Sequence, residues 1–505
     1  MGNKLTISAG LVVLIILAVN LVGNEFHLRF DFTEDKEYTL SPATRDILSH
    51  LDDAVTVKAY FSQKVPPDIA RTRQDFQDLL VEYSNRSGGN VAYTFVDPSA
   101  KEGDDQTAIQ AGIQPVTVNV REKDQMTQQR AFLGAQLSYR GKTEVIPFVR
   151  PGAAMEYALS TAIKKLSADA KPTVGIASGH AEPPIDELAE VKNSLENLYV
   201  VKEVPLTDTT DIPADVKTLV ITAPKERFTP VQLQKLDAFL QRDGRIFLGL
   251  NSVDANFQTA AGTAVNTGLE EWLKGKGLTV NHDFVVDSKC GAINVQQQMA
   301  FGMLQQQVPF PYLPIISKFA NHPAVQGLES VSLKFASTMK YEGDSTKKFI
   351  PLAFTSEKSG AMEAPQYLNY QKQWTTADFS QQRLVVGGAF QGKLAGQNAA
   401  RMVIIADGDF AVNGAAQERQ RLQPDNLNLL VNSVDWLSDD TGLIALRTKG
   451  ASSRPIKQME DSTKSILKYA NFLLPVLLAV GYGLFRYQQN KMKRLKWMSQ
   501  NYEKN

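Results

Sequence analysis

Two apolar segments, one near each end of the chain, constrain the fold more than any other feature. Residues 5–23 contain no charged side chain and are about as long as a helix that crosses the ~30 Å hydrocarbon core of a bilayer. Residues 466–485 form the second segment, in which Pro475 and two glycines are tolerable within a membrane helix. The pattern predicts a transmembrane helix at each end.

The flanking residues predict the orientation of these two segments. A basic tail, residues 486–505, follows the second segment, and the positive-inside rule places such a tail in the cytoplasm. The N-terminus is then also cytoplasmic and the bulk of the chain periplasmic, as in a two-pass protein of the bacterial inner membrane. The alternatives are a signal peptide, which lacks a small-x-small cleavage site here, and a buried core helix, which the basic tail disfavours.

Composition restricts what the region between the two segments can be. The chain has 54 basic and 54 acidic residues, so no net field favours binding to nucleic acid. Cys290 is the single cysteine, so this region folds without an intramolecular disulfide. No P-loop motif is present in the sequence, which excludes this chain as an ATPase of that type.

Residues 38–165 predict a first domain in which strands and helices follow a β-α-β-α-β-β order. That order is typical of a thioredoxin-like fold. A redox enzyme of this fold would need a Cys-x-x-Cys pair at the start of its first helix, whereas residues 64–67 read Lys-Val-Pro-Pro. A binding module is therefore expected. The predicted strands are 55–61, 91–96, 116–120, 131–139 and 144–149, and the main predicted helices are 43–51 and 66–86.

Residues 171–450 predict a second domain of α/β type. Short apolar runs alternate with amphipathic helices, which favours a parallel, doubly wound sheet. A long connection of mixed character, about 255–380, is expected to contain inserted strands. The predicted strands are 173–177, 199–204, 218–222, 245–250, 383–387 and 401–406, and the predicted helices are 185–198, 229–241 and 426–437.

Several short motifs, in this order along the chain, resemble the GldG family. They are Tyr38-Thr39-Leu40-Ser41, Phe95-Val96-Asp97-Pro98, Met155-Glu156-Tyr157, Gly179-His180-Ala181-Glu182, His322-Pro323-Ala324-Val325 and Asp425-Asn426 through Asn432. The resemblance implies a gliding-motility-associated auxiliary component of an ABC transporter. It also implies a thioredoxin-like domain followed by a class I glutamine-amidotransferase-like domain. The implied partners are an ABC permease, a cytoplasmic ATPase and an envelope cargo or partner protein.

The residues argue against catalysis in the second domain. An amidotransferase needs a cysteine on the turn after a central strand, activated by a histidine that a carboxylate orients. The corresponding turn presents Leu250 and Asn251, and Cys290 lies in an unrelated segment. No catalytic residue, metal or cofactor is expected.

Polar residues at the predicted strand ends form a candidate ligand or partner site. His180 and Glu182 follow the first strand, Asn251 follows the fourth, and Asp407 and Asp409 follow the last. Open α/β sheets bind ligands at this carboxyl edge. Strand-end residues of these types also cap helices and hold loops, so a structural role is the alternative. An envelope enzyme that uses His180 and Asp407, and a structural envelope protein, remain rival functions.

Residues 296–314 form a candidate docking loop. Two glutamine triplets and three prolines predict an irregular segment rather than a continuous helix or strand. Flexible methionine and aromatic side chains often dominate binding to a partner surface. A loop that packs on its own domain is the alternative. The candidate docking residues are Phe301, Met303, Leu304, Phe310 and Tyr312.

Overall fold

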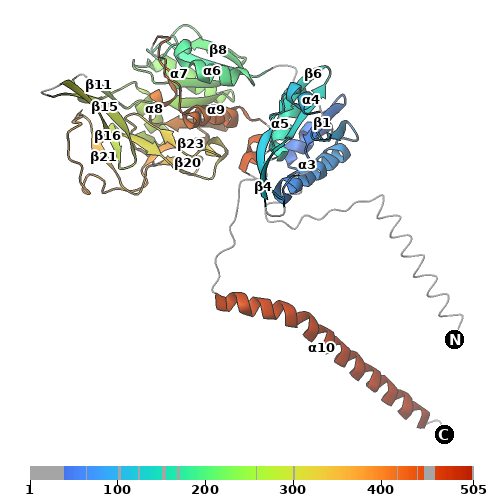
Figure 1. Cartoon of the computed structure of the whole chain (residues 1–505). Coiled ribbons are helices and arrows are strands. Elements are labelled where there is room, and N and C mark those ends of the chain that lie inside the picture. The colour runs from blue at the N-terminus through green and yellow to red at the C-terminus, as the bar shows by residue number, and fades with distance from the viewer. Residues whose placement is uncertain are drawn as a thin grey trace. The chain divides into compact units, whose positions relative to one another are not determined.

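The computed structural model describes the chain from Thr39 to Tyr502 with short gaps. The described ranges are 39–63, 65–100, 104–122, 125–149, 155–167, 171–256, 259–299, 302–417, 419–440, 442–448 and 461–502. One compact unit ends at Ala451, and the described residues of a second, Ser452–Asn505, form the helix α10 (Asp461–Tyr502). Figure 1 shows the elements of both units.

The first part of the larger unit is built on a small mixed sheet. Its strands are β1 (Val55–Phe61), β2 (Val91–Val96), β5 (Leu133–Tyr139) and β6 (Lys142–Ile146). They lie in the order β2-β1-β5-β6, in which only β1 and β2 are parallel. The strands β3 (Val116–Glu122) and β4 (Gln125–Ala131) form a separate hairpin. The helices are α2 (Pro42–Ser49), α3 (Pro67–Arg86), α4 (Asp104–Gln110) and α5 (Met155–Ser167).

Local sequence signals explain several of these elements. The Ser41 side chain caps α2 by accepting a hydrogen bond from the Thr44 N–H, the role that serine most often has at the start of a helix. Alternation along β1 turns Val55 and Val57 into the core, as expected for a strand with one buried face. The ring of Phe76 on α3 stacks on Phe61 with centroids 5.3 Å apart, which fixes that helix on the sheet.

The second part contains an eight-stranded sheet. Five of its strands run parallel: β7 (Thr173–Ser178), β8 (Val200–Pro205), β9 (Val216–Thr222), β10 (Arg245–Gly249) and β24 (Ala400–Ile405). The other three extend it antiparallel: β17 (Lys318–Phe319), β20 (Lys347–Phe354) and β23 (Val385–Gly392). The order is β17-β20-β23-β24-β10-β9-β7-β8. Its helices are α6 (Ala189–Glu196), α7 (Pro230–Gln241) and α9 (Pro424–Ser438), with the short turns η1 (Ile185–Leu188), η3 (Asp409–Ala411) and η4 (Leu443–Thr448).

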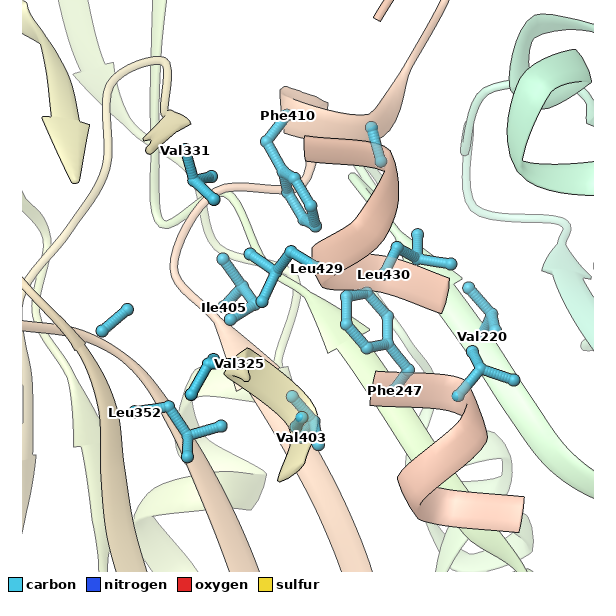
Figure 2. Close-up of a cluster of buried hydrophobic side chains, with 14 of the residues drawn as sticks. Val220, Phe247, Val325, Val331, Leu352, Val403, Ile405, Phe410, Leu429 and Leu430 are labelled. Carbon is cyan, nitrogen blue, oxygen red and sulfur yellow. The ribbon is translucent and has the colours of Figure 1, made fainter. Parts of the chain in front are cut away.

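Helices cover both faces of this sheet, which explains why its central strands are apolar at consecutive positions. On one face Phe247 of β10 belongs to the same core cluster as Leu429 and Leu430 of α9, as Figure 2 shows. On the other face its neighbours Ile246 and Leu248 belong to a second cluster with side chains of α7. A strand buried on both faces has no polar side to alternate with.

The connection between β10 and β23 contains the inserted strands that the sequence predicts. They form small sheets beside the large one, together with the helix α8 (Leu269–Gly275) and the turn η2 (Pro323–Val325). The strands are β11 (Val253–Asn256), β12 (Ala261–Ala264), β13 (Leu278–Val280), β14 (Asp283–Asp287), β15 (Cys290–Met299), β16 (Gly302–Ile316), β18 (Val331–Ser332), β19 (Met339–Tyr341), β21 (Ser359–Glu363) and β22 (Gln366–Tyr367).

The predicted fold class is wrong. Instead of a thioredoxin-like domain followed by a doubly wound amidotransferase-like domain between two membrane helices, the described residues form a mixed α/β structure with several sheets. The large sheet is not purely parallel, because the insertion returns to it as β17, β20 and β23. Apolar runs predict strands, but they do not specify which neighbour each strand pairs with.

The prediction of flanking transmembrane helices is also wrong. Among the described helices, none is both long enough and apolar enough to cross a membrane. In α10 the apolar stretch between Asn471 and Arg486, residues 472–485, spans about 21 Å at 1.5 Å per residue, short of a ~30 Å hydrocarbon core. Residues 5–23 lie outside the described residues. The predicted two-pass inner-membrane localisation depended on these spans and is corrected with them.

Candidate functional site

The carboxyl ends of four parallel strands place the predicted site residues along one edge of the large sheet. The strands β24, β10, β9 and β7 are neighbours in that order. Asp407 follows β24, Asn251 follows β10, and His180 follows β7. The backbones pack closely here, since a Cβ on Gly408 would collide with the backbone of Ala223. The loops are therefore held in contact before any side chain is considered.

Asn251, Asp407 and Asp409 form one hydrogen-bonded group at this edge. Asn251 donates from Nδ2 to Asp409 Oδ2 at 2.7 Å and accepts at Oδ1 from the Gly408 N–H at 2.6 Å. Asp407 is fully buried, and its two oxygens accept backbone N–H bonds from Asp409 at 2.7 Å and Lys334 at 2.6 Å. Burial and the charge of Asp409 raise the pKa of Asp407 above its ordinary value. These hydrogen bonds hold the loops together.

His180 and Glu182 form a second group with Phe228 and Gln232. Glu182 Oε2 accepts a hydrogen bond from the His180 N–H at 2.6 Å, and its Oε1 lies 3.5 Å from His180 Nδ1. His180 Nε2 contacts Gln232 Oε1 at 2.9 Å, and the imidazole stacks on Phe228 with centroids 3.7 Å apart. Both ring nitrogens thus face acceptor oxygens, an arrangement that suits a protonated imidazole.

The surroundings of His180 shift its pKa in opposing directions. Burial alone lowers the pKa, because it disfavours the charged form. The close approach of Glu182, the hydrogen bond to Gln232 and the negative charges of Glu182 and Glu226 outweigh burial and raise the pKa above its ordinary value. The side chains of His180 and Glu182 are only 4% and 2% exposed, so the pair lies beneath the surface.

The structure does not bring the two groups together. Strands β10 and β9 separate β24, which precedes Asp407, from β7, which precedes His180, and three strand spacings of ~4.8 Å put these two strand ends about 14 Å apart. Gln232 is already held in the capping box of α7, where its Oε1 also accepts from the Thr229 N–H at 2.8 Å. In the part of the chain that the structure describes, no cluster of three or more His, Cys, Asp or Glu side chains could hold a metal ion.

Two buried hydroxyls at the same edge are not among the predicted site residues. The side chains of Thr222, the last residue of β9, and Ser252, just after β10, are buried, and their hydroxyl oxygens have no hydrogen-bond partner. Small hydroxyl residues at the ends of apolar strands are the only sequence signal that marks them. The His282 Nδ1 contacts the Ser252 backbone oxygen at 2.9 Å and not its hydroxyl, so the two side chains do not form a nucleophile–base pair.

The described residues of the candidate docking loop, 296–314, lie in two paired strands, which corrects the prediction of an irregular segment. Residues 302–316 form β16, which pairs antiparallel with β15 from Met299↔Gly302 to Cys290↔Pro314, with one irregularity near Cys290. On its other edge β16 pairs with β18 at Ile315 and Ile316 and accepts backbone N–H bonds from Leu333 and Phe335, whereas N-terminal to Tyr312 no strand among the described residues pairs with this edge. An edge strand with an irregular register can accept proline, which has no N–H to donate.

The predicted docking residues fall into different environments. Phe310 and Tyr312 are each 1% exposed and belong to a core cluster with Phe284 and Phe335. Phe301 lies outside the described residues. The backbones of Met303 and Leu304 lie in the hairpin opposite Gln298 and Gln297.

Comparisons with known proteins show what this chain is similar to. Residues 171–437 match a family model described as an ABC-type uncharacterized transport system, and residues 34–138 match a domain of unknown function. A protein of Borreliella burgdorferi described as uncharacterized is 23% identical over 522 residues, and the match covers 97% of this chain and 99% of that protein.

Solved structures are similar only at a low level. The N-terminal domain of mmIFT52 is 13% identical with a TM-score of 0.35, and the match covers 53% of this chain and 98% of that domain. A ThuA-like protein of Parabacteroides merdae is 12% identical with a TM-score of 0.30, covering 56% of this chain and 92% of that protein. Both TM-scores lie below 0.5, so neither similarity defines the fold of this chain.

Proposed function

The chain belongs to the family described as ABC-type uncharacterized transport system, and from this premise we propose that it is a non-catalytic auxiliary subunit that binds its partners or cargo. The family match supports the coarser part of the resemblance noted in the sequence, an auxiliary component of ABC-type transport. Membership of the GldG family and a role in gliding motility are finer statements that belong to the proposal.

The polar side chains at the carboxyl edge already make hydrogen bonds within the protein, and this observation supports a non-catalytic role. Both oxygens of Asp407 accept backbone N–H bonds, and both polar atoms of the Asn251 amide are hydrogen-bonded within the same group. A general base must reach the substrate proton that it removes. Asp407 is fully buried and held by its neighbours, which suits a structural role.

The rival hypothesis is an enzyme that uses His180 and Asp407 together. A direct acid–base pair would require their polar atoms within hydrogen-bond distance of a shared substrate. The strand order instead places two strands between the groups. Cys290, the remaining nucleophile considered in the sequence, is the first residue of β15, and burial raises the pKa of its thiol. The separation of His180 from Asp407 and the raised pKa of the Cys290 thiol both favour binding over catalysis.

The proposed partners are an ABC permease and an ATPase, with a cargo or partner protein as a further ligand. The test is reciprocal co-purification of the tagged full-length chain and the tagged ATPase, scored for permease and for ATP hydrolysis by the complex. We expect all three proteins in both eluates. Full-length chain that co-elutes with neither transporter component, although folded by circular dichroism, would refute the proposal.

Replacement of Cys290 by Ser provides the catalytic control. We expect co-purification and ATP hydrolysis to be unchanged, with a stability change of about 1 kcal/mol or less for so small a difference in side-chain size. Complete loss of transport by a folded Cys290→Ser variant would instead support an enzyme.

A further inference from the structure

A cavity of about 330 Å³ lies within the larger unit, between α5 and the far end of α9. Four residues of α5 line one wall: Tyr157, Thr161, Lys164 and Lys165. Their spacing puts them on one stripe of the helix, which completes a turn every 3.6 residues. The volume is within the range of pockets that bind small molecules.

The opposite face of α5 anchors the helix in the protein core, so the face that lines the cavity is available to a ligand. Leu159, Ile163 and Leu166 are buried in the core of the first sheet, which fixes the helix from behind. The stripe that faces the cavity is not needed for that packing. A ligand could therefore contact it without displacing the first core.

Much of the cavity lining is apolar. Pro172, Leu198, Leu443 and Ile444 contribute aliphatic surface, and Tyr157 and Tyr199 contribute aromatic rings. Leu443 and Ile444 belong to η4, which is buried against the rest of the unit. A ligand that fills this space must have an apolar body, because polar groups would lose their hydrogen bonds to water there.

Three ammonium groups, from Lys164, Lys165 and Lys171, also line the cavity. Lys165 Nζ lies 2.7 Å from Glu144 Oε1, and Lys164 Nζ lies 3.8 Å from Asp439 Oδ1. Lys171 Nζ donates to the Glu196 backbone oxygen at 2.7 Å, a neutral acceptor. The ammonium groups of Lys165 and Lys171 have three N–H donors each, so their contacts leave donors for an anionic ligand.

The two carboxylates in the lining are already engaged. Asp435 accepts from the Tyr199 hydroxyl at 2.9 Å, and Asp439 accepts from the Ile444 N–H at 2.8 Å while facing Lys164. A different polar group is not satisfied: the Thr161 hydroxyl oxygen is buried and has no hydrogen-bond partner. Buried polar atoms without a partner are uncommon and need an explanation. Rotation of the Thr161 side chain to another χ1 rotamer would turn this hydroxyl into the cavity, where a ligand oxygen would supply the missing partner.

We propose that this cavity binds a small amphipathic anion, an alkyl chain that ends in a carboxylate. The chain would contact Leu198, Leu443 and Ile444, and the carboxylate would accept hydrogen bonds from the Thr161 hydroxyl and the lysine ammonium groups. The walls come from α5 in the first part of the unit and, in the second, from α9, η4, the residues just before β7 and the connection between α6 and β8. The bound ligand would therefore connect the two parts.

Isothermal titration of the full-length chain with decanoate tests the proposal. We expect saturable binding of decanoate at one site, at least tenfold weaker binding of decyltrimethylammonium, and no detectable binding of butyrate. The first comparison replaces the carboxylate by a cationic headgroup on a chain of nearly the same length, and the second removes most of the chain. Equal binding of decanoate and decyltrimethylammonium, or no saturable binding of decanoate, would overturn the proposal.

Four variants locate the site. Leu198→Trp fills the cavity and should weaken decanoate binding at least tenfold, and Ile444→Trp does the same from another wall if the first variant does not fold. Thr161→Val removes the hydroxyl at nearly constant shape and should weaken binding about fivefold. Thr161→Ser, which keeps the hydroxyl, should bind within about twofold of the parent.

Lys217→Gln is the matched control, because Lys217 is exposed on β9 and does not line the cavity. It should bind decanoate as the parent does. Folded Leu198→Trp and Ile444→Trp proteins that bind decanoate with the parent affinity would place the ligand elsewhere and refute the assignment. A Thr161→Val variant with altered melting temperature but unchanged affinity would likewise contradict the predicted hydrogen bond.

Discussion

Asn251 donates a hydrogen bond of 2.7 Å to Asp409, which ties the loop after β10 to the loop after β24. The two residues are 158 positions apart in sequence. Asn251 is 7% exposed, so its two hydrogen bonds are largely shielded from water. Such bonds are costly to break when one partner remains buried without a replacement.

Replacement of Asn251 by Ala tests this relationship. The Gly408 N–H and one Asp409 oxygen would lose their partners, and we expect the free energy of unfolding to fall by about 2–3 kcal/mol in urea titrations. Asn251→Asp should also destabilise, because it places a second carboxylate against Asp409. If Asn251→Ala kept its stability yet lost partner or ligand binding, these residues would form a binding site rather than a structural connection.

The contact between His180 and Glu182 predicts that the free energy of unfolding depends on pH in the neutral to alkaline range. A raised histidine pKa means that the folded state holds the proton more tightly than the unfolded chain. The resulting stability is fully present below the ordinary pKa of 6.5 and is lost as the pH rises through the raised value. The unfolding free energy of the parent should therefore fall more steeply than that of His180→Gln as the pH increases from 6.5.

Urea unfolding at several pH values measures this difference, with His50→Gln as the control. The His50 side chain is 76% exposed, so this variant shows how the loss of a surface histidine by itself changes the curve. Parallel curves for the parent and His180→Gln would show that the His180 imidazolium does not contribute to the pH dependence of the unfolding free energy.

His322 predicts the opposite pH dependence. Burial, aided by the charge of Lys348, lowers its pKa from 6.5 to about 4. Its Nδ1 accepts a hydrogen bond from the Ala324 N–H at 3.3 Å, which requires that this nitrogen carry no proton. The unfolded chain therefore binds a proton first, and stability falls as the pH drops from 6.5 towards 4, by roughly 3 kcal/mol at most.

In His322→Asn the side-chain oxygen can still accept at the start of η2, but the side chain cannot take up a proton. We expect this variant to be less stable than the parent at neutral pH, since it loses the edge-to-face contact with Trp436 at 4.8 Å. Between pH 6.5 and 4 its unfolding free energy should fall less steeply than that of the parent. A slope identical to the parent's would rule out this role for His322.

Replacement of Phe310 tests whether β16 belongs to the protein core or forms a docking element. Its side chain is 1% exposed and its ring lies 5.2 Å from that of Tyr312. Phe310→Ala should lower the free energy of unfolding by about 3–5 kcal/mol, as large-to-small core replacements do. Tyr312→Phe keeps the ring and removes only a 3.5 Å contact with Met362 Sδ, so it should cost less than about 1 kcal/mol.

Differential scanning calorimetry of both variants, with co-purification measured in parallel, separates the two possibilities. A Phe310→Ala protein that melts at the parent temperature but no longer associates with the transporter components would restore the docking hypothesis for this residue.

The sequence by itself determined the local elements of the chain. The Ser41 cap and the apolar runs that became β7, β9, β10 and β24 are properties of a few consecutive residues. Hydrogen-bonding side chains and hydrophobic periodicity act over such short distances, so they can be recognised without knowledge of the fold. The positions of the candidate site residues at strand ends followed from the same signals.

Only the tertiary structure decided how those elements combine. It placed two strands between His180 and Asp407, made β16 an edge strand that accepts prolines, and turned one stripe of α5 towards a cavity. These outcomes depend on which segments meet, often after more than a hundred intervening residues, as Asn251 and Asp409 do. Strand order and side-chain burial are set by packing free energy over the whole unit, which no local pattern contains.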